Sequence, residues 1–130
     1  MIKAKTDTLK LKAAAYATQI LGFDDCRFTD LELSSSTAVY KKWLEYGFHG
    51  EMTYLEKHLP FKENPGLLLP DARSAIVVIK NYKNTSVQRL INRIKIARYA
   101  VGKDYHGIML KNLKRLEDFL KKEDPAISCY

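Results

Sequence analysis

The sequence AIVVI, residues 75–79, decides the fold class because it is a compact run of small and β-branched apolar residues. Such a run, bounded by turn residues, is typical of a strand that is buried on both faces of a sheet. The segment FDDCRF at 23–28 can form a second strand, and IKIARYA at 94–100 fits either a strand or a helix end. Because a stable sheet needs about three or more strands, we expect another segment or another chain to complete this one.

Helical segments are expected on both sides of this strand in the sequence. Helices are predicted at residues 7–21, 39–47 and 51–58, and from 105 to the Asp124-Pro125 pair that ends the last one. In these segments apolar residues recur at helical spacing or polar capping residues lie at the ends. Pro60 is expected to interrupt the third of these helices, because a proline disfavours a helical residue before it. Together the patterns predict an α/β fold in which helices pack on a small sheet, as a single domain over residues 1–130.

The composition is that of an ordinary globular protein. Hydrophobic residues make up 46% and charged residues 28% of the 130 residues, which argues against a disordered tail. No stretch approaches the roughly 20 apolar residues of a membrane helix, and the first residues lack the apolar core of a secretory signal. We therefore expect a cytoplasmic protein with no membrane partner. Cys26 and Cys129 are too few to hold an iron–sulfur cluster, and the histidines lack zinc-ligand spacing, so no metal site is predicted.

The charge balance favours a polyanionic partner. Lys and Arg number 22 against 15 Asp and Glu, which gives a net charge of +7. Basic proteins bind RNA by contacting phosphates and releasing counterions, although a surface rich in solvated lysines is the simpler alternative. The predicted last helix carries a basic face formed by Lys111, Lys114, Arg115 and Lys122.

Two clusters that could carry chemistry lie in and next to the predicted helix over 51–58. Residues 47–52, GFHGEM, place a histidine between two glycines, which permits close backbone approach to a ligand and offers acid–base groups. The alternative is a turn between helices with solvated polar residues. Lys57, His58 and Lys62 follow, and two cations with an imidazole can hold phosphate or carboxylate groups unless they form only a solvated basic turn.

A third cluster, RYAVGKDYH at 98–106, surrounds a glycine at the start of the last helix. Asp104 is well placed to cap that helix, whose first backbone N–H groups favour an anion or a polar ligand edge. Tyr105, Asp104 and His106 can form a hydrogen-bonded network that relays a proton. The alternative is that Asp104 is only a cap and that the tyrosines belong to the core.

The three clusters together resemble the epoxyqueuosine reductase family. WLEYGFHGEMTYLEKH at 43–58, KENPGLLLPDARSAIVVIKNY at 62–82 and IARYAVGKDYHGIMLKNLKRLEDFL at 96–120 follow the family's motifs in the family's order. The initial segment that ends in LGFDD at 21–25 also fits, so the resemblance covers residues 8–124 and is to the N-terminal part of the family.

The resemblance implies a function in tRNA maturation. Members of the family reduce epoxyqueuosine to queuosine at the wobble position of tRNA anticodons, using cobalamin and two [4Fe–4S] clusters. Carried over by motif, the expected cobalamin or substrate neighbours are His58, Arg98, Tyr99, Asp104, Tyr105 and His106, with Lys57 and Lys62 as weaker candidates. No catalytic residue is assigned.

Departures from the family pattern limit what this chain is expected to do alone. Lys62 stands where the family has arginine and Asn64 where it has aspartate, and lysine cannot make a bidentate guanidinium contact. The V-D-S-like segment with the proposed proton-donor aspartate, the glycine-rich stretch and the cluster cysteines are not in this sequence. We expect activity only with a complementary C-terminal polypeptide. The alternative is a non-catalytic binding module for RNA, a corrinoid or a protein partner.

Overall fold

The computed structural model describes residues 2–32, 35–82 and 104–130, and the side chains of this part from residue 6 onward. The chain divides into two compact units. The first comprises Met1–Arg27 and Ile76–Ser128, and the second comprises Phe28–Ala75 and Cys129–Tyr130. Arg98 and Tyr99, and the ambiguous segment 94–100, lie outside the described residues.

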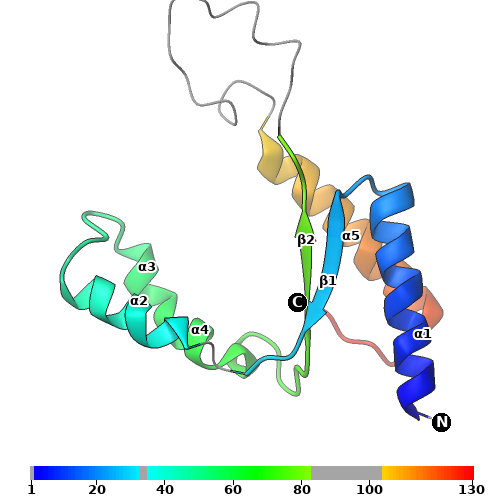
Figure 1. Ribbon diagram of the computed structural model, residues 1–130, viewed down its shortest axis with the longest axis horizontal. Coiled ribbons are helices and arrows are strands. Elements are labelled where there is room, and N and C mark those ends of the chain that lie inside the picture. Colours follow the sequence, from blue (N-terminus) through cyan, green and yellow to red (C-terminus); the bar gives the residue numbers. More distant parts are fainter. Residues whose placement is uncertain (1, 33–34, 83–103) are drawn as a thin grey trace, which may run out of the picture. The chain divides into compact units, whose positions relative to one another are not determined.

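Two strands, β1 (Asp25–Thr29) and β2 (Ala75–Ile79), pair side by side in opposite directions as a two-stranded sheet (Figure 1). The backbone N–H of Asp24 donates to the carbonyl of Ile79 at 2.8 Å, and the N–H of Asn81 donates to Asp24 Oδ2 at 2.6 Å, which fixes one end of the pair. Both predicted strands are confirmed. The structure also confirms the α/β class, with helices packed on a small sheet.

The prediction that AIVVI is buried on both faces is wrong. Ile76 and Val78 are half-buried, but Val77 is 50% exposed and Ile79 is 54% exposed. Within the described residues the sheet has two strands, so β2 has one paired edge and its alternate side chains remain open to solvent. A short apolar run has the same sequence pattern whether or not a second layer covers it.

The first unit is built on the packing of two helices, α1 (Ile2–Ala15) and α5 (Tyr105–Glu123). α1 continues into the π-helical turn η1 (Tyr16–Ile20), and Gly22 then adopts a left-handed conformation with φ of 72°, as its place after the helix predicts. The Tyr16 and Phe119 rings stack with centroids 4.2 Å apart. The core side chains of this unit are Ala13, Ala17, Leu21, Phe23, Cys26, Leu116 and Leu120.

The second unit contains the short helices α2 (Ser36–Glu45), α3 (Tyr54–Lys57) and α4 (Leu59–Glu63), followed by the 3-10 turn η2 (Pro65–Leu67). The Tyr40 hydroxyl donates to the Leu55 carbonyl at 3.0 Å, which ties α2 to α3. The expected helix over 51–58 is shorter than predicted. Pro60 does not end it but lies in the first turn of α4, where a missing N–H leaves no hydrogen bond unmade.

Candidate functional site

The first group of candidate residues lies at the start of α5. Asp104 caps the helix, because its Oδ1 accepts the backbone N–H of His106 at 2.9 Å. The same oxygen lies 2.8 Å from His106 Nδ1. The Tyr105 ring stacks on the His106 ring with centroids 4.1 Å apart. The structure thus brings together all three candidate residues of this cluster that it describes.

This arrangement fixes the orientation of the His106 ring. A carboxylate can only accept a hydrogen bond, so Nδ1 carries the proton that it donates to Asp104, and Nε2 takes no part in this hydrogen bond. The side chains of Asp104 and His106 are exposed. The backbone N–H of His106 and, after it, the His106 ring lower the pKa of the Asp104 carboxyl. The group therefore offers an ionised carboxylate and an oriented imidazole at a helix start.

Acid is expected to weaken the start of α5 through Asp104. A carboxyl whose folded pKa lies below its ordinary value of 3.8 stabilises the folded state above that value, and this contribution is lost as the pH falls through the folded pKa. Asp104→Asn keeps a capping side chain without a charge, so its helical circular dichroism should lack this acid step. Superimposable curves for wild type and variant below about pH 4 would contradict the assignment.

The second group of candidate residues lies in the second unit, with Lys57 on α3, Lys62 on α4 and His58 between the two helices. The His58 ring meets the Tyr54 ring edge-on with centroids 5.8 Å apart. Lys62 Nζ lies 5.3 Å from the centroid of the Tyr40 ring, a cation–π contact. The backbone N–H of Lys62 donates to the His58 carbonyl at 3.2 Å, so these two residues occupy successive helical turns. Lys57 is exposed on α3.

One functional candidate of the GFHGEM turn is buried. His49 is 7% exposed, its Nε2 lies 3.0 Å from Glu56 Oε1, and its ring lies 6.1 Å from the Trp43 ring. Its Nδ1 is buried without a hydrogen-bond partner among the described residues. The alternative of a turn with solvated polar residues is therefore wrong for His49. The signal in the sequence is the pair of glycines, since Gly47 and Gly50 both adopt left-handed backbone angles around it.

The thiol and metal chemistry of the described residues is limited. Burial, and after it the charge of Asp25, raise the pKa of the Cys26 thiol, which disfavours a reactive thiolate. No group of three or more His, Cys, Asp or Glu side chains that could hold a metal ion occurs in the described part of the chain. Over the same residues, no helix is long and apolar enough to cross a membrane.

Comparison with known proteins places the chain in a family that is named for a reductase. The family described as "Epoxyqueuosine reductase QueG, DUF1730" matches residues 62–130, which include β2 and α5. The chain belongs to the epoxyqueuosine reductase family. No solved structure matches it.

Curated relatives with the name epoxyqueuosine reductase match most of the chain. The protein from Cellulophaga algicola is 36% identical over 104 residues, which cover 79% of this chain and 34% of the relative. The protein from Francisella cf. novicida is 35% identical over 114 residues, 81% of this chain and 32% of the relative. The protein from Escherichia coli is 33% identical over 107 residues, which cover 78% of this chain and 28% of the relative. The chain thus spans about a third of the length of these relatives.

Proposed function

We propose that this chain supplies part of the cofactor- and substrate-binding region of a tRNA epoxyqueuosine reductase. The observation that carries the proposal is the Asp104–His106 arrangement at the start of α5, because it lies inside the segment that the family matches. In this role the chain helps to bind tRNA that carries epoxyqueuosine in its anticodon. The reduction itself would require the remaining two thirds of the length of the relatives.

The described residues fit the polar periphery of cobalamin in part. Cobalamin carries amide side chains and a phosphate, which need hydrogen-bond donors and acceptors around the ring. The exposed Asp104 carboxylate, the His106 Nε2 and the Tyr105 hydroxyl provide such groups at the start of α5. When bound, cobalamin would supply the reduced cobalt that acts on the epoxide. The residues of this chain would orient the cofactor and the substrate.

The proposal is tested by reconstitution. The chain is mixed with a separately produced polypeptide that carries the remainder of a relative, with cobalamin, a reductant and tRNA that contains epoxyqueuosine. Conversion to queuosine, followed by mass spectrometry of the nucleosides, should require both polypeptides. Conversion by the second polypeptide alone at the same rate would overturn the proposal. RNA binding by this chain without any conversion would favour the alternative of a non-catalytic binding module.

Changes at the start of α5 should lower turnover more than stability. In the reconstituted enzyme, Asp104→Ala removes the group that orients His106, and we expect turnover to fall by about 10-fold or more. Tyr105→Phe keeps the stacked ring and removes only the hydroxyl, so turnover should fall without a shift of the thermal midpoint. Asp7→Asn, an exposed change on α1, is the matched control. Unchanged turnover in both variants would remove Asp104 and Tyr105 from the site.

A further inference from the structure

The basic excess of the chain belongs to one of its two units. Counted over the sequence, the segments of the first unit carry 17 Lys and Arg against 8 Asp and Glu. The segments of the second unit carry 5 Lys and Arg against 7 Asp and Glu. The first unit is therefore strongly basic, with a formal charge of +9, and the second is weakly acidic, at −2. An interface for a polyanion is expected on the first unit rather than on the whole surface.

Within the first unit, α5 presents a stripe of exposed cations. Lys111, Arg115 and Lys122 are separated by four and seven residues, spacings that place side chains on the same side of a helix. All three are exposed, and no ion pair involving them occurs among the described residues. Asp118 lies in the same stripe. The buried residues of the helix, Leu116 and Leu120, occupy its other side.

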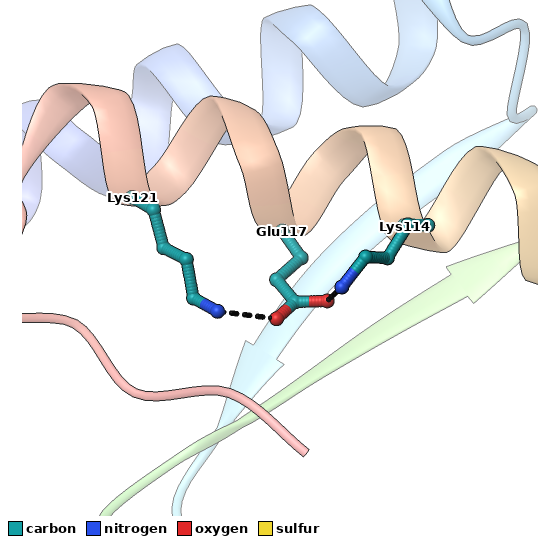
Figure 2. Close-up of polar contacts among 3 residues, drawn as sticks. All are labelled: Lys114, Glu117 and Lys121. Atoms are coloured by element: carbon teal, nitrogen blue, oxygen red, sulfur yellow. Dashed lines mark hydrogen bonds and ion pairs between the residues drawn. The ribbon is translucent and has the colours of Figure 1, made fainter.

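The remaining lysines of α5 are engaged. Figure 2 shows Glu117 between Lys114 and Lys121, with Nζ–Oε distances of 2.9 Å and 2.6 Å respectively. The bonds from Lys121 and then from Lys114 lower the pKa of the Glu117 carboxyl, so the carboxylate remains ionised between them. A phosphate that approached Lys114 or Lys121 would compete with this carboxylate. Lys111, Arg115 and Lys122 form no such ion pair among the described residues, and Asp118 is the one carboxylate of α5 that lies in their stripe.

We propose that Lys111, Arg115 and Lys122 form the surface of this chain that contacts the phosphate backbone of the tRNA. The inference rests on the proposed function, which it deepens by naming a contact surface for the substrate. From Lys111 to Lys122 the helix rises by about 16 Å, enough for cations to follow several consecutive phosphates of one strand. The surface begins about two turns from Asp104, so it can hold the backbone while a base lies near the helix start.

An anionic membrane is a poorer fit to the same stripe. A helix that lies on a membrane inserts an apolar face, but the apolar face of α5 around Leu116 and Leu120 is buried within the first unit. Asp118 also interrupts the row of cations. Binding to anionic vesicles is therefore an outcome that the test must distinguish.

The test compares two variants that remove the same number of lysines from the same helix. Lys111→Gln with Lys122→Gln removes free cations, and Lys114→Gln with Lys121→Gln removes engaged ones. Binding of the full chain to a fluorescent anticodon stem-loop RNA is measured by anisotropy over a salt series. We expect the first variant to bind about 10-fold more weakly and its salt slope to fall by about 1.4, from two lost phosphate contacts. The second variant should bind within about threefold of wild type, with its slope unchanged.

Asp118→Asn gives a change in the opposite direction, with an expected gain of about twofold in affinity, because it removes the anion within the stripe. Circular dichroism confirms that each variant keeps its helices. The inference would be overturned if the two double variants lost RNA affinity equally, or if the wild-type chain did not bind the RNA at low salt. It would also be overturned if the wild-type chain bound phosphatidylserine vesicles tightly and only the Lys111→Gln, Lys122→Gln variant lost this binding. The reconstituted reduction tests the proposed function separately. If the Lys111→Gln, Lys122→Gln variant binds RNA as tightly as wild type and still supports conversion to queuosine, the α5 surface is overturned and the proposed function stands.

Discussion

Leu116→Ala is expected to lower the free energy of unfolding by about 2–5 kcal/mol, the largest loss of stability predicted for this chain. Leu116 is 3% exposed and lies on the buried side of α5, so its truncation leaves a cavity as well as losing apolar burial. The expected loss is a large part of the total stability of a small domain. Urea unfolding followed by far-ultraviolet circular dichroism measures it.

Leu110→Ala is the matched control for this measurement. Leu110 belongs to the same helix and undergoes the same chemical change, but its side chain is 68% exposed. Its variant should differ from wild type by no more than about 0.5 kcal/mol. Equal effects of the two substitutions would show that the side of α5 that carries Leu116 is not the packed side.

His49→Ala is expected to destabilise the second unit by about 2 kcal/mol. The buried imidazole fills the space beside Trp43 and contacts Glu56, and alanine cannot replace either contact. Trp43 is the single tryptophan of the sequence, so its fluorescence reports directly on this unit. The denaturant midpoint should fall and the native fluorescence should change.

His58→Ala provides the comparison in the same unit, because His58 is exposed and contacts Tyr54 only edge-on. Its unfolding midpoint should stay close to that of wild type. Glu56→Gln preserves a hydrogen-bond acceptor for His49 Nε2 and should also have a small effect, since Glu56 is largely solvated. A His49→Ala midpoint equal to that of His58→Ala would mean that the turn is held by its glycines alone.

Local sequence patterns predicted the elements of the fold well where a short segment determines its own structure. AIVVI coincides with β2, because β-branched residues between turns have few alternatives. Gly22 and Asp104 occupy the helix ends that their backbone freedom and capping oxygen predict. The Asp104, Tyr105 and His106 group was also predictable, since all three residues are adjacent in sequence at a helix start.

Properties that depend on distant neighbours could not be predicted in the same way. The exposure of Val77 depends on what covers the sheet, which no pattern within AIVVI encodes. The burial of His49 depends on Trp43 and Glu56, which lie on two different elements. The engagement of Lys114 and Lys121 by Glu117 is local, but helical spacing alone does not determine which of the neighbouring cations this carboxylate pairs with. The single domain, the cofactors and the contributions of Arg98 and Tyr99 stay predictions.

The partly open strand β2 has a practical consequence for work with this polypeptide. Val77 and Ile79 present exposed aliphatic side chains on a strand whose second edge has no partner strand among the described residues, and such strand edges can pair with strands of neighbouring molecules. Concentrated solutions should therefore self-associate through this two-stranded sheet, and dilute samples are the suitable form for the measurements described above.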